Sequence, residues 1–383
     1  MTGRTARVLL APDKFKGSLD AAGVAAAVAG GLRRTRPDVE VRCLPVADGG
    51  DGTLSAARAA GFALVPVAVH GPTGEPVDTA FARRGATAVV EMADACGLGR
   101  LPGGVGAPLT ASSRGLGEVL VAALDAGCRE LVVGIGGSAS TDGGAGMLAA
   151  LGARVLDETG EVVADGGAAL AAAVTLDVED LHPGLRDARI LVACDVDNPL
   201  TGPEGAAAVY GPQKGCTPAD VVLLDAALDH WSDVVADAAP EVADARDVPG
   251  AGAAGGVGFG LLAVLGAEPR PGIDLLLELL GFDEALEDVD LVVTGEGSLD
   301  DQSLRGKAPI GVATRARAAG IPVVAVCGRR LLTDAELRAA GILRAYALTD
   351  IERDLDTCLR SPTPLLERIG QQIGHTHLPP TAN

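Results

Sequence analysis

Lysine is rare in this chain, and the few lysines lie in segments that could bind an anion. Of 31 basic residues only four are lysines: Lys14, Lys16, Lys214 and Lys307. A chain that uses arginine for general surface charge keeps lysine where a compact ammonium is needed and a planar guanidinium does not fit. Lys14 and Lys16 stand between an apolar run and an alanine-rich helical segment, and the start of a helix commonly binds phosphate. The lysines therefore predict contacts with a negatively charged ligand, and solvated loop lysines are the alternative.

A loop rich in glycine and small hydroxyl side chains follows the apolar run 131–135. Glycine lets backbone N–H groups approach an anion, and the helix predicted from Gly144 onward adds N–H donors without partners. We expect this loop to hold a phosphate or a carboxylate. Its candidate binding residues are Gly136, Gly137, Ser138, Ser140, Thr141 and Asp142.

Other interpretations of this loop stay open. The spacing Gly134-x-Gly136-x-x-Ala139, with Asp157 about 20 residues further on, fits a dinucleotide-binding turn and thus an NAD-dependent dehydrogenase of a small hydroxy acid. A non-catalytic anion-binding protein or an ordinary glycine-rich turn would also fit. The chain contains neither G-x-x-x-x-G-K-[ST] nor G-x-S-x-G, which argues against a nucleotide P-loop and a serine hydrolase.

Aspartates follow two further predicted strands. Asp48 and Asp51 flank two glycines after the run 39–46, and Asp195 follows the run 190–194. Ligands of open α/β sheets bind at the carboxyl ends of strands, and aspartates there commonly serve Mg²⁺ or a substrate hydroxyl. A tight turn with a capping side chain would explain one of the paired aspartates, but explains two less well.

The elements that would carry these residues are strands followed by helices at both ends of the chain. Strands are expected at 7–11, 39–46, 290–294, 322–326 and 343–348, and helices at 18–36, 113–126, 221–239 and 310–319. Glu296, Asp300 and Lys307 are expected in one loop after the strand 290–294. Residues 62–94 indicate a β meander instead. Parallel α/β patterns around a different middle indicate an inserted domain.

Composition limits the class of protein. The 383 residues are enough for two domains, and 48% of them are hydrophobic although only 2% are aromatic. A net charge of −20 argues against nucleic acid or an anionic membrane as a partner. Seven cysteines without a C-x-x-C pair fit reduced thiols in the cytoplasm, and the charged N-terminal segment does not fit a signal peptide.

Five segments together resemble the bacterial glycerate kinases that phosphorylate D-glycerate. They are APDKFKGS, PVADGGDGT, GIGGSASTDGGAGM, CDVDNPLTGP with YGPQKG, and TGEGSLDDQSLRGKAP. The resemblance implies a flavodoxin-like (Rossmann-type) parallel-sheet domain, residues 1–64 and 283–383, with a second α/β domain, residues 65–282, inserted into it. It also implies ATP and Mg²⁺ as cofactors and D-glycerate as substrate, with 2-phosphoglycerate a more common product than 3-phosphoglycerate.

The resemblance and the residue chemistry together give the candidate site. Phosphoryl transfer depends on positioning and on charge neutralisation more than on covalent catalysis. The candidate catalytic residues are Asp195, Lys16, Lys307 and Asp48, with Asp195 as the first choice for base or metal-positioning group. The candidate metal ligands are Asp48, Asp51 and Asp195. The candidate substrate and nucleotide contacts are Asp13, Lys14, Gly49, Gly50, Asp51, Arg114, Gly136, Gly137, Ser138, Ser140, Thr141, Asp142, Asn198, Lys214, Gly295, Glu296, Gly297 and Asp300. A homodimer is a further possibility.

Overall fold

The computed structural model describes residues 5–242 and 244–378, which form two compact units. The first unit takes the described residues up to Asp48, residues 55–60 and the residues from Ile273 onward. The second takes Gly49–Leu54 and Gly61–Gly272. The boundaries expected at 65 and 283 thus lie four residues after the start of the long segment of the second unit at Gly61 and ten residues after the return to the first unit at Ile273. Ile273 belongs to the first unit because it packs on a helix there, where a Cβ on Gly311 would lie 2.5 Å from its side chain.

The first unit contains a five-stranded sheet in the order β2-β1-β11-β12-β13, and all its strand pairs are parallel. The strands are β1 (Arg7–Pro12), β2 (Glu40–Cys43), β11 (Leu291–Leu299), β12 (Val323–Arg330) and β13 (Arg344–Ala347). Counted within this unit, the order is 2-1-3-4-5, that of flavodoxin-like folds. The predicted fold class is confirmed.

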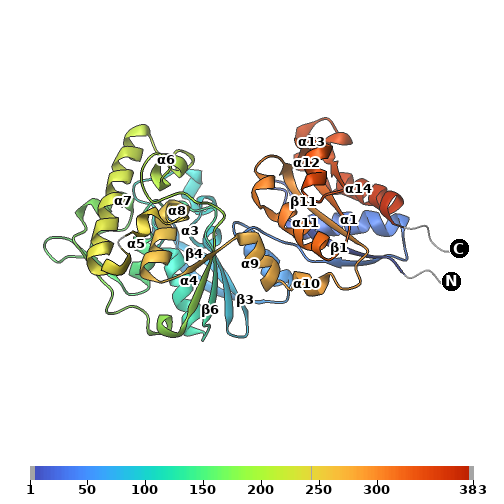
Figure 1. Ribbon diagram of the computed structural model, residues 1–383. Coiled ribbons are helices and arrows are strands. Elements are labelled where there is room, and N and C mark those ends of the chain that lie inside the picture. Colours follow the sequence, from blue (N-terminus) through green and yellow to red (C-terminus); the bar gives the residue numbers. More distant parts are fainter. Residues whose placement is uncertain (1–4, 243, 379–383) are drawn as a thin grey trace. The chain divides into compact units, whose positions relative to one another are not determined.

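Helices cover both faces of this sheet. They are α1 (Ala21–Thr35), α9 (Gly272–Leu279), α10 (Phe282–Ala285), α11 (Ala308–Ala318), α12 (Asp334–Ala339), α13 (Leu355–Arg360) and α14 (Pro362–His377), and α2 (Thr53–Ala59) spans both units. Alternate β1 residues such as Val8 and Leu10 share a buried cluster with α1 and α14, and α11 packs on β1 and β11. Helices α1 and α14 run side by side (Figure 1) because glycines face each other, and a Cβ on Gly31 would lie 2.0 Å from a carbonyl of α14.

The second unit contains a six-stranded mixed sheet in the order β10-β9-β6-β5-β4-β3. Its strands are β3 (Ala63–His70), β4 (Pro76–Arg84), β5 (Thr87–Glu91), β6 (Glu130–Gly134), β9 (Arg189–Ala193) and β10 (Glu268–Arg270), and β7 (Arg154–Leu156) with β8 (Thr175–Asp177) forms a separate pair. Strands β3, β4 and β5 are antiparallel neighbours, which confirms the predicted meander. Strands β5, β6, β9 and β10 are parallel, so their carboxyl ends share one edge.

The core of the second unit is built mainly from small aliphatic side chains around its helices. These are α3 (Met92–Cys96), α4 (Arg114–Asp125), α5 (Ala145–Ala150), α6 (Ala206–Tyr210), α7 (Pro218–Ala238) and α8 (Ala253–Phe259). Trp231 of α7 is fully buried, and its indole N–H donates to the carbonyl of Gly143 at 3.2 Å. This hydrogen bond from α7 therefore holds the glycine-rich loop in place.

Three of the local predictions that differ from the structure concern the first helix, β2 and β11. The first helix starts at Ala21, after an Asp20 cap whose carboxylate accepts from Gly23 N at 2.7 Å, and not at Ser18. Strand β2 is shorter than the run 39–46 because its pairing with β1 ends at Cys43. Strand β11 continues to Leu299 because Ser298 and Leu299 still pair with β12, so Glu296 lies in a strand and not in a loop.

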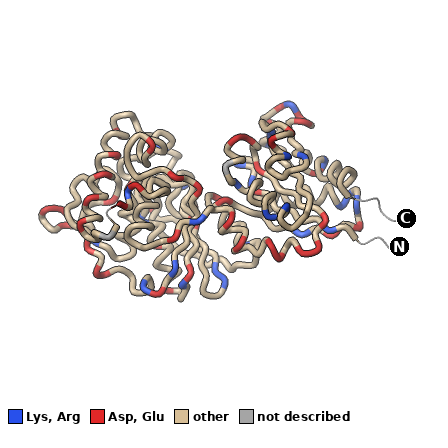
Figure 2. Tube along the Cα trace, in the orientation of Figure 1, with Lys and Arg blue, Asp and Glu red and all other residues tan. Residues whose placement is uncertain are grey.

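Charged residues are distributed over both units, and acidic ones predominate (Figure 2). Among the helices that the structure describes, none is both long enough and apolar enough to cross a membrane.

Candidate functional site

The first unit brings Asp13 and Glu296 to the point where the strand order of its sheet reverses. In a 2-1-3-4-5 sheet this point lies between the first and third strands, here β1 and β11, and ligands bind beyond their carboxyl ends. Asp13 follows the last residue of β1, and its backbone N–H donates to Gly295 O of β11 at 2.8 Å. Glu296 is the next residue of β11. The two carboxyl groups therefore come from the two strands that border this point.

Both carboxyl groups are buried and hold their protons more tightly than usual. Asp13 is 8% exposed and Glu296 is 9% exposed. Burial raises the pKa of Asp13 to about 7, with Lys14 opposing the shift and Asp48 adding to it. Burial likewise raises the pKa of Glu296 to about 7, with Ser303 and Lys307 opposing the shift. A carboxyl group with a pKa near neutrality is typical of functional sites.

Cations and small side chains surround these acids within the same unit. Lys14 is half-buried and its backbone N–H donates to Asp13 Oδ1 at 2.6 Å, whereas Lys16 is exposed. Lys307 caps α11, and its Nζ donates to Gln302 Oε1 at 3.2 Å. The carboxylate of Asp300 accepts from Gln302 N and Ser298 Oγ at 3.0 and 3.3 Å. Asp13 and Glu296 thus interact electrostatically with each other and with four further predicted site residues of this unit: Lys14, Asp48, Asp300 and Lys307.

Two predicted glycines of this unit have a packing role. A Cβ on Gly295 would lie 2.2 Å from Val326 O, so the close approach of β12 requires glycine there. A Cβ on Gly297 would lie 3.3 Å from Lys16 N, so Gly297 allows the Lys16 segment to lie against β11.

In the second unit the turn at Gly49 lies directly on the glycine-rich loop. A Cβ on Gly134 would come within 2.5 Å of Gly49 O, and one on Gly136 within 2.7 Å of Gly50 Cα. The turn also touches the end of β9, because a Cβ on Gly49 would lie 2.5 Å from that of Ala193. The segments that carry Asp51 and Asp195 are therefore neighbours.

Glu91, which the sequence analysis missed, fixes this turn. Its carboxylate accepts from Gly52 N and Leu54 N at 3.0 and 2.9 Å, and it is only 5% exposed. Burial raises the pKa of Glu91, and the two N–H donors oppose that shift. In the sequence, the one feature that could have indicated Glu91 was its position as an acid at the end of the apolar run Thr87–Glu91.

Much of the glycine-rich loop faces the interior of the second unit. Ser138, Ser140, Thr141 and Asp142 are all buried, whereas Gly137 is exposed and Gly136 is half-buried. The Asp142 carboxylate accepts from Ser113 N and Ser113 Oγ, both at 2.8 Å, so it ties the loop to the start of α4. The hydroxyl oxygens of Ser140 and Thr141 have no hydrogen-bond partner in the part of the chain that the structure describes.

Lys214 also lies inside the second unit. It is 2% exposed, and its Nζ donates to the carbonyl of Ser140. Burial lowers the pKa of Lys214 to about 8, and the Asp142 charge opposes the shift. In this arrangement Asp142 and Lys214 hold the loop, and a ligand could reach the buried side chains of Ser138, Ser140 and Thr141 only if the loop moved.

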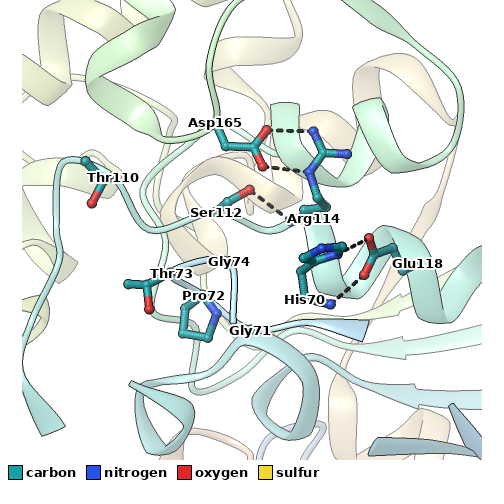
Figure 3. Close-up of a pocket in the computed structure, with 10 residues that line it drawn as sticks. All are labelled: His70, Gly71, Pro72, Thr73, Gly74, Thr110, Ser112, Arg114, Glu118 and Asp165. Carbon is teal, nitrogen blue, oxygen red and sulfur yellow. Dashed lines mark hydrogen bonds and ion pairs between the residues drawn. The ribbon is translucent and has the colours of Figure 1, made fainter. Parts of the chain in front are cut away.

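Arg114 borders a pocket of about 440 Å³ in the second unit, shown in Figure 3. Its guanidinium donates to both oxygens of Asp165 at 2.6 and 2.7 Å. Beside this pair, His70 Nδ1 and Glu118 Oε1 are 2.6 Å apart. The predicted role of Arg114 in carboxylate or phosphate binding stays a prediction, because two of its donors already serve Asp165.

Asp195 and Asn198 follow β9 and support the backbone around them. Asp195 is exposed, and its Oδ1 accepts from Gly272 N at 2.7 Å. The Asn198 amide donates to Glu204 O at 2.7 Å and accepts from the Tyr210 hydroxyl at 2.6 Å. The predicted metal ligands are divided, since Asp48 belongs to the first unit and Asp51 and Asp195 to the second. Within residues 5–242 and 244–378, no group of three or more His, Cys, Asp or Glu is arranged to hold a metal ion.

Comparisons with known proteins agree on one family. The Glycerate kinase family profile matches residues 8–378. The glycerate kinase of Bacillus subtilis (strain 168) is 43% identical over 370 residues, 96% of either chain. The glycerate 2-kinase of Escherichia coli (strain K12) is 45% identical over 375 residues, 97% of either chain.

The chain belongs to the glycerate kinase family. A solved structure of a glycerate kinase 2 from Salmonella typhimurium LT2 has the same fold, with a TM-score of 0.84 at 40% identity, covering 97% of this chain and 98% of that one. The predicted family and enzyme class are confirmed, and nothing supports the NAD-dependent dehydrogenase. Membership of a kinase family implies ATP as the phosphoryl donor.

Proposed function

We propose that this glycerate kinase transfers the γ-phosphoryl group of MgATP to the 2-hydroxyl of D-glycerate, giving 2-phosphoglycerate and ADP. The observation that carries the position of transfer is the 45% identity, over 97% of both chains, to the Escherichia coli protein named glycerate 2-kinase. The resemblance of the motifs favours D-glycerate as the acceptor.

The residue chemistry supports phosphoryl transfer. Lys16 and Lys307 belong to the unit that carries the buried acids, and ammonium groups neutralise the charge on a transferring phosphoryl group. Lys307 stands at the start of α11, where backbone N–H groups and the helix dipole also favour phosphate. We assign both lysines to the phosphates of the nucleotide and of the transition state.

Magnesium fits the acids of the second unit as an ion that arrives with the nucleotide. Mg²⁺ usually keeps several waters and binds one or two carboxylates together with substrate phosphates, so a site without a complete protein cage is expected. Asp51 and Asp195 would hold it, because the Gly49 turn lies against the end of β9. Bound Mg²⁺ would neutralise charge on the phosphates. Asp48, the third predicted ligand, belongs with Asp13 and Glu296 in the first unit.

Enolase distinguishes the products. Enolase converts 2-phosphoglycerate directly to phosphoenolpyruvate, whereas 3-phosphoglycerate first needs a mutase. We expect MgATP and D-glycerate with this enzyme to give a phosphoenolpyruvate signal with enolase alone. A signal that appears only after phosphoglycerate mutase is added would reassign the transfer to the 3-hydroxyl. ATP consumption without D-glycerate would contradict the proposed acceptor.

A further inference from the structure

Glu296 has a buried carboxylate oxygen that the fold leaves without a partner. Its Oε1 makes no hydrogen bond within the described residues, although Ser303 bonds to the carboxylate. A buried polar atom left unpaired destabilises a protein, so such an atom requires an explanation. Glu296 stands beside the point where the sheet order reverses, which is where ligands of this fold bind. The orphan oxygen is therefore placed where a substrate atom could pair with it.

Four other candidate acids accept hydrogen bonds from the protein. Asp142 is fully buried and accepts from both the backbone and the side chain of Ser113. Asp195 accepts from Gly272 N, and Asp300 accepts from Gln302 N and Ser298 Oγ. Asp13 accepts from Lys14 N through Oδ1. Glu296 differs from these acids because a buried oxygen of its carboxylate remains available.

We propose that Glu296 is the catalytic base of the reaction proposed above, and the proposal rests on that function. Its Oε1 takes the proton of the glycerate hydroxyl as the hydroxyl oxygen bonds to the γ-phosphorus. The bond between that phosphorus and the β–γ bridging oxygen breaks, and ADP leaves with the electron pair. The proton ends on the carboxyl group of Glu296 and passes to solvent after product release.

The surroundings of Glu296 suit a base that works near neutral pH. A proton acceptor is most effective when its pKa is close to the working pH, and burial raises the pKa of Glu296 to about 7. Polar and charged groups from several elements interact with the Glu296 carboxyl group. They are Asp13 after β1, Asp48 after β2, Asp300, Ser303 and Lys307 after β11, and the Cys327 thiol of β12. The acids favour its protonated form, and Lys307 favours its ionised form.

Kinetics of Glu296→Gln test this role. The amide keeps the size of the side chain but cannot accept the proton, so kcat should fall roughly 10²- to 10⁴-fold. The dissociation constants of D-glycerate and ATP, measured by calorimetry, should stay within a few-fold of wild type. Glu284→Gln changes an exposed carboxylate of the same unit and should leave kcat unchanged.

The outcomes separate the two proposals. If wild-type enzyme yields no 2-phosphoglycerate in the enolase assay, the proposed function fails whatever Glu296 does. If wild-type enzyme yields it and folded Glu296→Gln keeps its kcat, Glu296 is not the base. A large loss of kcat in Asp195→Asn, with Glu296→Gln near wild type, would transfer the role to Asp195. If Glu296→Gln does not fold, Glu296→Asp replaces it in the test, because aspartate moves the carboxylate back by one methylene group. An unchanged kcat in Glu296→Asp would overturn the proposal.

Discussion

The free energy of unfolding of Glu296→Gln should increase relative to that of the wild-type protein as the pH rises. The ordinary pKa of a glutamate is 4.5, and burial raises that of Glu296 to about 7 in the folded protein. Between these values the folded state binds more protons than the unfolded state, so the free energy of unfolding falls as the pH rises. The destabilisation from Glu296 is thus small below pH 4.5 and complete above pH 7.

The size of the effect follows from the two pKa values. Linkage of a single group with these values gives a destabilisation of about 1 kcal/mol at pH 5 and about 3 kcal/mol at pH 8. Glutamine has no such titration, and the cost of burying its amide does not depend on pH. The difference in stability between Glu296→Gln and wild type should therefore shift by about 2 kcal/mol in favour of the variant between pH 5 and pH 8.

Urea unfolding at several pH values measures this shift, and hydrogen exchange of β1 and β11 assigns it to the first unit. Glu284→Gln is the control, since its carboxylate is exposed and its substitution should give the same difference from wild type at every pH. A constant difference for Glu296→Gln would show that the Glu296 carboxyl group is not buried among acids. A difference that shifts in favour of wild type with rising pH would show that a cation pairs with Glu296.

Two further substitutions test the lysines and the glycine contacts. Lys16→Arg and Lys307→Arg keep the charge but replace a compact ammonium by a planar fork, so each should lower kcat by roughly 10²- to 10³-fold in steady-state assays. The exposed control Arg338→Lys should keep the wild-type kcat, and arginine variants that also keep it would remove the argument from lysine scarcity. Gly134→Ala would place a Cβ 2.5 Å from Gly49 O and should lower stability to urea by about 1–3 kcal/mol, whereas Gly99→Ala, with no atom within 4 Å, should be near neutral.

Continuous apolar runs predicted the fold well. The apolar runs that became β1, β6, β9 and β12 lie within a residue or two of their predicted ends, apart from the C-terminal end of β12, because a fully buried parallel strand needs a continuous apolar stretch. The polar half of β11 escaped prediction. Residues 295–299 are glycine-punctuated, and only their pairing with β12, a partner that follows in the chain, makes them a strand.

The site was predicted less completely because burial distinguishes Asp13 and Glu296 from the other acids. Asp13, Asp48 and Glu296 lie far apart in the chain, and in the sequence they resemble acids that serve only as local caps. Glu91 was missed because a single acid after an apolar run gives no sign that two backbone N–H groups will turn toward it. Burial and unpaired atoms are products of the folded chain, so no local pattern could have selected Glu296 from the other carboxylates.

The glycines show why a glycine-rich loop is an ambiguous signal. A backbone N–H that binds an anion and a backbone that must pass close to another segment both require the absence of a Cβ. Gly134 and Gly136 meet the second requirement, since each faces backbone atoms of the Gly49–Gly50 turn. Gly137 is exposed and has a φ of +77°, which favours glycine, and a Cβ added to it would lie 3.2 Å from the Cβ of Ala93 but no closer than 4.0 Å to a backbone atom, so no backbone of another segment presses on this glycine. If the loop holds a substrate anion, Gly137 is therefore the position at which the exposed backbone would do so.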